Sequence, residues 1–273
     1  MRYARNSIQL SHSRDVPLLR QVMRSEFVTH SQLFEFMQLS HQERSRKSFD
    51  WRLRRLVSRD LVKRQVDPTC KADFVYSITS KAALLLQGAG EYSIVGRTRF
   101  NGREVERSIF HAVALNEFQL SLLRTGTLVR WIGSLEIRSQ NELTGFGFAK
   151  DYDAVVTIQS AGKEYRFALE YERTPKSFRR YREIAEALNH EIQVTRVLYL
   201  VSNYDLLQFV SRFFNTVRCR VLFGLESDWR EHLLDMRVRC NSGATPLSLS
   251  QALGDVPAST AATPIGSTFP LNF

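Results

Sequence analysis

Apolar positions recur at helical spacing over the first sixty residues and then give way to short runs typical of strands. Residues 29–31 (Thr-His-Ser) break the pattern before the second helical stretch and offer caps for it, and Ser40 can cap the third, since side chains of these types can bind free backbone amides. The predicted elements are helices over 16–28, 32–39 and about 42–60, strands over 61–66 and 74–78 with a turn at 67–71, and a fourth helix over 82–87 that ends at Gly88.

Three helices, a two-stranded wing and a closing helix follow the order of a winged helix-turn-helix domain. The run from Tyr76 to Ala82, followed by three leucines, resembles the junction between wing and last helix in many such domains. The sequence therefore predicts a DNA-binding domain over residues 14–90.

The third helix has two different faces. At 100° per residue, Phe49, Leu53 and Leu56 share one stripe that fits a core. Basic residues gather opposite and could enter a groove or contact phosphates, although a solvated helix face is the plainer reading of each one alone. Trp51 could pack on a neighbouring helix or lie against sugar and base. The predicted DNA-binding set is Arg44, Lys47, Trp51, Arg54 and Arg55 on this helix, with Lys63, Arg64 and Lys71 on the wing.

A second unit is expected over 111–240, after a connector at 91–110. It should contain a helix over 111–124, a strand over 128–137, a loop over 139–147, paired strands over 151–159 and 163–172, a helix over 177–191, a buried central strand over 196–202, a helix over 206–215 and a strand over 220–225. This order describes an α/β sandwich. Residues 241–273 have a single charged side chain and are rich in Ser, Ala, Thr, Pro and Gly, so we expect a disordered tail, either passive or partner-binding.

Charge and cysteine content narrow the function classes. Residues 1–100 hold 18 Lys and Arg against 9 Asp and Glu, whereas residues 101–273 hold 20 against 19. A basic excess confined to the predicted DNA-binding domain suits phosphate neutralisation. The three cysteines form neither a disulfide framework nor a zinc pattern, and no apolar run is long enough for a membrane span. We therefore expect a cytoplasmic protein with no membrane partner.

Three carboxylates of the second unit stand where chemistry could use them. Glu170 and Glu172 are two residues apart on one predicted strand and so point the same way. Asp153 opens the preceding strand and would lie beside them in a hairpin. Converging carboxylates repel, and oxygen-only ligands favour Mg²⁺ or Mn²⁺, so the pattern predicts a metal site; a solvated strand end with a salt bridge is the alternative.

This layout resembles the PD-(D/E)XK nuclease superfamily. The resemblance implies that Asp153 and Glu170 bind a divalent ion, with Glu117 as a first-helix acid, and that a lysine after the second acid positions water. Tyr152 replaces the motif proline and Glu172 replaces the motif lysine, so Lys176 or Arg173 would have to reach in. On this basis the candidate catalytic residues are Asp153, Glu170, Glu172 and Lys176, and the candidate metal ligands are Asp153, Glu170 and Glu117.

Over residues 14–225 the chain also resembles the replication-relaxation family of plasmid and mobile-element proteins. The resemblance rests on 111–116 (HAVALN), Trp131, Asp153-Ala154 and 170–174 (EYERT), which lead into a basic helix. The fold class expected is α/β in two domains, an N-terminal winged helix-turn-helix followed by an α/β restriction-endonuclease-like sandwich.

Three functions remain open on these residues. The first is a double-stranded DNA-binding protein of a plasmid or mobile genetic element that acts in replication, relaxation or transfer, with relaxase or replication proteins of the same element as partners. The second is a transcription regulator with a non-catalytic α/β domain, and the third is a Mg²⁺-dependent DNA endonuclease with a degenerate motif. The oligomeric state is open as well, with a homodimer among the options.

Overall fold

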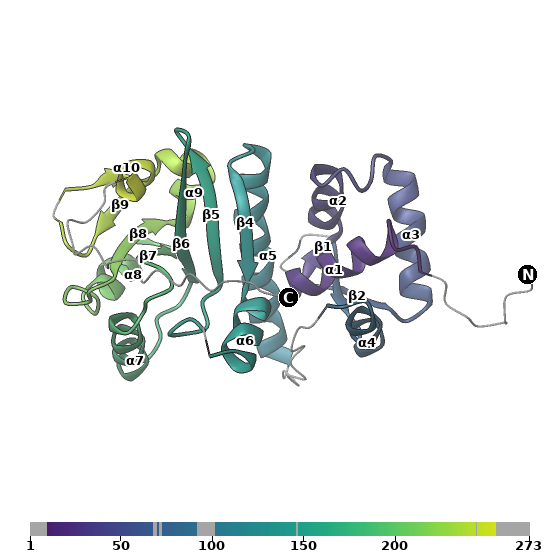
Figure 1. The fold of residues 1–273 in the computed structure, drawn as a ribbon, viewed down its shortest axis with the longest axis horizontal. Coiled ribbons are helices and arrows are strands. Elements are labelled where there is room, and N and C mark those ends of the chain that lie inside the picture. Colours follow the sequence, from purple (N-terminus) through teal and green to yellow (C-terminus); the bar gives the residue numbers. More distant parts are fainter. Residues whose placement is uncertain are drawn as a thin grey trace, which may run out of the picture.

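Two units lie side by side along the long axis of the molecule (Figure 1). The computed structural model describes residues 10–67, 70, 73–91, 102–145, 147–243 and 245–254. Residues 10–91 form the N-terminal unit and residues 102–254 the C-terminal unit, and these names are kept below. The predicted mixed α/β fold is confirmed, since helices pack on a large sheet of parallel and antiparallel strands.

The N-terminal unit consists of helices around a small antiparallel sheet with the strand order β1-β3-β2. Among the predicted capping residues 29–31, Thr29 caps α2 with a complete capping box, so the helix begins at His30 rather than Gln32. The third helix starts later than the pattern indicates, because Ser45 rather than Ser40 accepts the backbone amide at its first turn. The elements are α1 (Asp15–Ser25), β1 (Val28–Thr29), α2 (His30–Leu39), α3 (Arg46–Ser58), β2 (Val62–Val66), β3 (Phe74–Ile78) and α4 (Ser80–Gly88).

The C-terminal unit is built on a seven-stranded sheet with the order β10-β9-β8-β7-β6-β5-β4. β4, β5 and β6 form an antiparallel meander, β6, β7 and β8 are parallel, and β9 and β10 are antiparallel again. The elements are α5 (Gly102–Arg124), β4 (Leu128–Gly133), α6 (Ser134–Leu143), β5 (Ala154–Ser160), β6 (Lys163–Glu172), α7 (Phe178–Asn189), β7 (Arg196–Val201), α8 (Tyr204–Ser211), β8 (Arg220–Leu225), α9 (Glu226–His232), the 3₁₀ turn η2 (Leu233–Asp235), β9 (Arg237–Cys240), β10 (Leu247–Ser248) and α10 (Leu249–Gly254).

Helices cover both faces of this sheet, which explains the continuous apolar run of β7. Side chains of α6, α7 and α8 pack on one face, with Val197 and Tyr199 of β7 among them. Side chains of α5, α9 and α10 pack on the other face, against Leu198 and Leu200. Successive β7 residues therefore enter different cores, and the predicted central strand is confirmed.

The strand predicted over 128–137 is wrong in its second half, because β4 ends at Gly133 and α6 begins at Ser134. The alternating apolar pattern that suggested a strand has another cause. Leu135 packs into the core of the N-terminal unit, whereas Ile137 packs into the core between the sheet and α7. A helix between two cores buries residues on opposite sides, and this imitates the period of a strand.

Helix α5 also serves both units. It begins at Gly102, so the predicted connector over 91–110 is shorter and the helix predicted over 111–124 is longer. Phe118 and Leu122 pack on the seven-stranded sheet, whereas Leu120 belongs to the core of the N-terminal unit. The amide of Asn116 donates to the Phe27 carbonyl at 2.7 Å, which ties α5 to β1 across the boundary. The two units therefore share a core element.

The segment 241–273, predicted to be disordered, is structured at its start. β10 extends the sheet edge, and the α10 side chains Leu249, Ala252 and Leu253 are fully buried against the sheet. The segment is polar overall but has three apolar positions at helical spacing. These side chains pack on the sheet, which supplies the apolar surface that the segment itself lacks. Residues 255–273, and Lys71 of the predicted wing, lie outside the described residues.

Candidate functional site

One candidate surface is the solvent face of α3. Phe49, Leu53 and Leu56 are buried as predicted, and the opposite face is exposed. Trp51 is 62% exposed, so it does not pack on a neighbouring helix. Arg44 lies just before the helix, and Arg44, Lys47 and Arg54 are exposed, with no ion pair to another described residue. These cations are therefore available to an anionic partner.

The β2–β3 hairpin carries the rest of this surface. Lys63 and Arg64 are exposed on β2, and the Arg64 guanidinium lies 4.6 Å from the ring centroid of Phe74 on β3. A groove of about 550 Å³ separates the hairpin from α3. Its lining includes Arg46, Arg54 and Arg64, which come from both sides. Asp50 and Asp73 line it as well, so the groove presents charges of both signs beside the exposed helix.

Arg55 was assigned to the DNA-binding set, but the structure holds it in an ion pair. Its guanidinium donates to Asp15, a carboxylate that is almost fully buried, at 2.5 Å. Arg52, which sequence reasoning missed, is buried between Asp15 and Glu43 and forms an ion pair with Glu43 at 2.7 Å. A signal was present, since Arg52 falls about 40° from Leu56 on the helical wheel, beside the apolar stripe. Both arginines thus fix α3 to the rest of the N-terminal unit.

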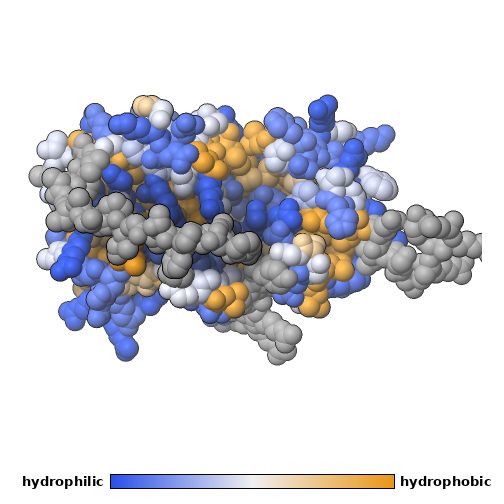
Figure 2. Space-filling view, viewed as in Figure 1, coloured by the Kyte–Doolittle hydropathy of each residue, from blue (hydrophilic) through white to orange (hydrophobic). Residues whose placement is uncertain are grey.

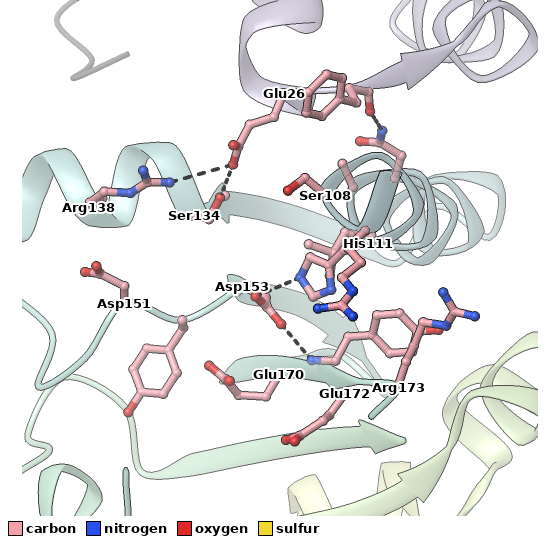
Figure 3. A pocket seen from close by; sticks show the side chains of 18 of the residues that line it. Glu26, Ser108, His111, Ser134, Arg138, Asp151, Asp153, Glu170, Glu172 and Arg173 are labelled. Atoms are coloured by element: carbon pink, nitrogen blue, oxygen red, sulfur yellow. Dashed lines mark hydrogen bonds and ion pairs between the residues drawn. The ribbon is translucent and has the colours of Figure 1, made fainter. Parts of the chain in front are cut away.

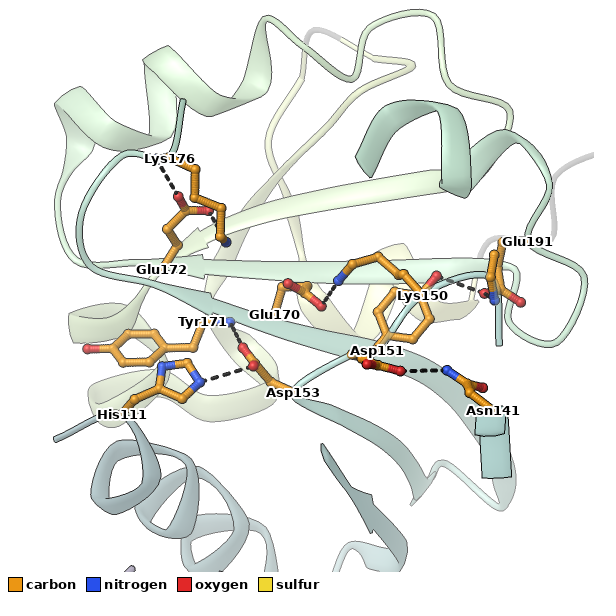
Figure 4. Close-up of polar contacts among 12 residues, drawn as sticks. His111, Asn141, Lys150, Asp151, Asp153, Glu170, Tyr171, Glu172, Lys176 and Glu191 are labelled. Carbon is orange, nitrogen blue, oxygen red and sulfur yellow. Dashed lines mark hydrogen bonds and ion pairs between the residues drawn. The ribbon is translucent and has the colours of Figure 1, made fainter. Parts of the chain in front are cut away.

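The second candidate is the carboxylate cluster, defined here as Asp153, Glu170 and Glu172. Pairing of Ala154 with Leu169 in the β5–β6 ladder places Asp153 opposite Glu170, as the predicted hairpin requires. Glu170 and Glu172 point toward the α7 side of the sheet and are nearly fully buried (Figure 4). The structure therefore brings the three acids to one end of the sheet.

Each carboxylate of the cluster has a cationic partner (Figure 4). The His111 ring Nε2 lies 3.0 Å from Asp153 Oδ1, and the Tyr171 backbone amide donates to Asp153 Oδ2 at 2.7 Å. Asp153 raises the pKa of His111 above its usual value, against the opposing effect of burial, and His111 in turn lowers the pKa of Asp153. Lys150 forms an ion pair with Glu170, whose pKa is nevertheless raised by burial.

Glu172 has a set of partners of its own. The Tyr181 hydroxyl donates to its Oε1 at 2.5 Å, and Lys176 donates to it through both its backbone amide and its ammonium, the latter at 3.0 Å from Oε2. Burial and this bond raise the pKa of Tyr181. Lys176, a candidate catalytic residue, therefore reaches the end of this strand, where its partner is Glu172, while Lys150 pairs with Glu170.

Glu117 does not reach the cluster. It accepts from Arg124 at 2.5 Å, and Arg124 also binds Glu35 of α2, so Glu117 belongs to the contact between the units. His111, six residues earlier on α5, faces Asp153 instead. His111 was noted only as the start of the motif over 111–116, and neither it nor Lys150 was assigned to the cluster, because both reach the cluster through tertiary packing. The nearness of Lys150 to Asp153 in the chain was the available signal.

Asp153 and Glu170 supply the oxygen donors that a hard cation prefers, which fits the predicted Mg²⁺ or Mn²⁺. Within the described ranges, however, no group of three or more His, Cys, Asp or Glu side chains converges as metal ligands would. An ion at these two carboxylates would replace the ammonium of Lys150 and the ring nitrogen of His111. The donor set therefore fits a metal only with a change of ion-pair partners.

The cluster forms the floor of a cleft of about 860 Å³ between the units, named the inter-unit cleft below. Figure 3 shows Glu26 and Arg138 on one side and Glu170, Glu172 and Arg173 on the other. Glu26 accepts from Ser134 at 2.5 Å and lies 3.9 Å from Arg138, which joins the N-terminal unit to α6 at the rim. Hydrophilic side chains gather across the middle of the face shown in Figure 2.

No protein-family model, curated protein or solved structure matches this chain. Among the described residues, no helix combines the length and the apolar character needed to cross a bilayer. The functional conclusion therefore depends on the geometry of the two candidate sites.

Proposed function

We propose that the protein binds double-stranded DNA through the N-terminal unit, as a winged helix-turn-helix domain. In this proposal α3 enters the major groove and the β2–β3 hairpin contacts the flanking backbone. The observation that carries it is the exposed face of α3, where Lys47, Trp51 and Arg54 stand on a helix that is otherwise anchored by its core side and by arginine ion pairs to other elements. Helix order, hairpin and local basic excess support the same reading.

We further place this activity in a plasmid or mobile genetic element, where the protein would act in replication, relaxation or transfer beside relaxase or replication proteins. The support is the resemblance of its short motifs to the replication-relaxation family. The antiparallel meander β4–β5–β6 followed by the parallel strand β7 agrees with a nuclease-like sandwich as the second domain.

The test is a gel-shift and anisotropy titration of duplex DNA with the full chain. Replacing Lys47 and Arg54 together by Ala should weaken binding by about 1–3 kcal/mol per specific contact and should lower the slope of log K against log salt by roughly 2. A matched control replaces Lys163 and Arg237, two exposed cations of the C-terminal unit, and should leave binding unchanged. Equal affinity of the two double variants would show that another surface holds the duplex.

A second candidate function is metal-dependent DNA cleavage. The observation that favours it is the convergence of Asp153, Glu170 and Lys150 at the ends of neighbouring strands. A bound Mg²⁺ or Mn²⁺ would supply an activated water and stabilise charge on the scissile phosphate. Lys150, displaced from Glu170 by the ion, would then be the lysine nearest to the site in place of a lysine at position 172.

Cleavage is tested on supercoiled, linear and branched DNA with Mg²⁺ or Mn²⁺. Asp153→Ala and Glu170→Ala should each abolish cleavage and keep duplex binding. The control Glu164→Ala, an exposed change on the same strand as Glu170, should leave both cleavage and duplex binding unchanged. Cleavage that survives both changes would place the chemistry elsewhere. If cleavage and calorimetric metal binding are both absent, the second domain is architectural.

A further inference from the structure

The inter-unit cleft is built by both units and is separate from α3. Its walls come from the end of α1 and the following residues, from α5, from β4 and α6, and from the segment between β6 and α7. In Figure 1, α3 lies at the edge of the N-terminal unit farthest from the seven-stranded sheet. A duplex held on α3 therefore does not lie over the cleft of the same molecule.

Charge in the cleft is divided between floor and rim. Seven Lys or Arg and five Asp or Glu line it, and the acids of the floor are paired with Lys150, His111 and Lys176. At the rim, Arg107 on α5 is exposed and forms no ion pair with another described residue. Arg173 is exposed as well, and its guanidinium lies 3.3 Å from the ring centroid of Phe110. The rim thus offers cations that the floor does not neutralise.

Aromatic surfaces accompany these cations. Phe27 and Trp131 line the cleft and are half-buried. His111 is half-buried beside Asp153, and its ring stacks on the nearly fully buried Tyr171, with centroids 5.6 Å apart and planes at 24°. Cations interleaved with flat rings are the feature by which proteins hold single-stranded nucleic acid, since every base has a face that can stack.

The size of the cleft selects between a strand and a duplex. A volume of about 860 Å³ falls in the range of pockets that enclose one drug-sized molecule. A few nucleotides of one strand can enter such a space, whereas a double helix is too wide. From charge, aromatic lining and size together, we propose that the inter-unit cleft binds a single-stranded nucleic-acid segment while α3 holds a separate duplex. This proposal rests on the proposed function in taking nucleic acid as the ligand.

The experiment measures anisotropy of a fluorescein-labelled oligo-dT and of a labelled duplex, each titrated with the full chain in buffer containing EDTA. Replacing Arg107 and Arg173 by Ala should weaken oligo-dT binding about tenfold and lower its salt slope by roughly 1.4, because each single-strand phosphate contact contributes about 0.7. Duplex binding should not change. Replacing Lys47 and Arg54 by Ala should weaken duplex binding and leave oligo-dT binding unchanged. The control that replaces Lys163 and Arg237 should change neither duplex binding nor oligo-dT binding.

The outcomes separate the two proposals. Oligo-dT binding that is insensitive to Arg107 and Arg173, or that is lost only with Lys47 and Arg54, overturns the cleft as a single-strand site and leaves duplex recognition standing. Cleft-dependent oligo-dT binding without any duplex binding overturns the proposed function of α3 instead. Simultaneous capture of a bead-bound duplex and a labelled oligo-dT by the wild type, lost in either double variant, is the result expected if both sites act together.

Discussion

The α3 surface and the carboxylate cluster differ in the exposure and the pairing of their charged side chains. On α3, Lys47 and Arg54 extend into solvent with no acidic partner among the described residues. In the cluster, Glu170 and Glu172 are nearly fully buried and each has its own lysine. Exposed charge contributes little to folding and remains available for a ligand, whereas buried charge must be paired to exist at all. The first region should therefore tolerate substitution and the second should not.

The largest effect is expected at Lys150. Its side chain is 11% exposed and that of Glu170 is 6% exposed, so Lys150→Met would leave a carboxylate buried without its cation. The free energy of unfolding, measured by urea denaturation at neutral pH, should fall by about 3–5 kcal/mol. Adding Glu170→Gln should recover much of this loss, because a neutral amide tolerates burial better. A single variant as stable as the wild type would show that the pair is not desolvated.

A similar loss is expected inside α3 itself, at Arg52. Arg52→Met removes the partner of Glu43, whereas Asp15 keeps Arg55. Unfolding free energy should therefore fall by about 3 kcal/mol, at the low end for a broken buried pair. The matched variant is Lys47→Met on the exposed face of the same helix. If the two variants were equally stable, the division of α3 into a buried and a solvent face would be wrong.

A smaller effect should appear in the pH dependence of the His111–Asp153 pair. The raised pKa of His111 means that its contribution is complete below the unfolded value of about 6.5 and is lost as pH rises through the higher folded pKa. The lowered pKa of Asp153 means that its contribution is present above about 3.9 and is lost as pH falls through the lower folded pKa. The pair therefore contributes most between about pH 4 and 6.5.

Urea unfolding in EDTA across this range compares the wild type with His111→Ala. The stability difference should be largest in that window and should shrink toward alkaline pH, leaving only the pH-independent loss of ring stacking on Tyr171. If the stability difference were constant with pH, protonation of His111 would not be coupled to its contact with Asp153.

The smallest stability effect is expected for Lys47→Ala. Its side chain is exposed on α3, so the unfolding free energy should stay within about 0.5 kcal/mol of the wild type. Duplex affinity should nevertheless fall, with a salt slope reduced by roughly 1. If Lys47→Ala lowered both the unfolding free energy and the duplex affinity, the α3 surface would not differ from the carboxylate cluster in its tolerance of substitution.

Much of the element order could be predicted from the sequence. The α3 stripe, the β5–β6 hairpin and the buried strand β7 follow from local periodicity, which depends on neighbours in the chain. The hairpin also brings Asp153 beside Glu170, so part of the carboxylate cluster was foreseeable. Exposed residues such as Lys47 and Arg54 could be assigned for the same reason, since a helix has two faces whatever it packs against.

Other features depend on contacts between distant segments. Leu135 and Ile137 show the spacing of a strand because the helix that carries them lies between two cores. Leu249, Ala252 and Leu253 are buried because they pack on one face of the sheet. Lys150 and His111 contact the carboxylate cluster, whereas Glu117, which was expected there, contacts Arg124. Packing in three dimensions decides which side chain lies beside a buried carboxylate. Local pattern thus determined the elements and their exposed faces, whereas tertiary structure decided the ion pairs and the cleft, since desolvation acts on whatever lies nearby in space.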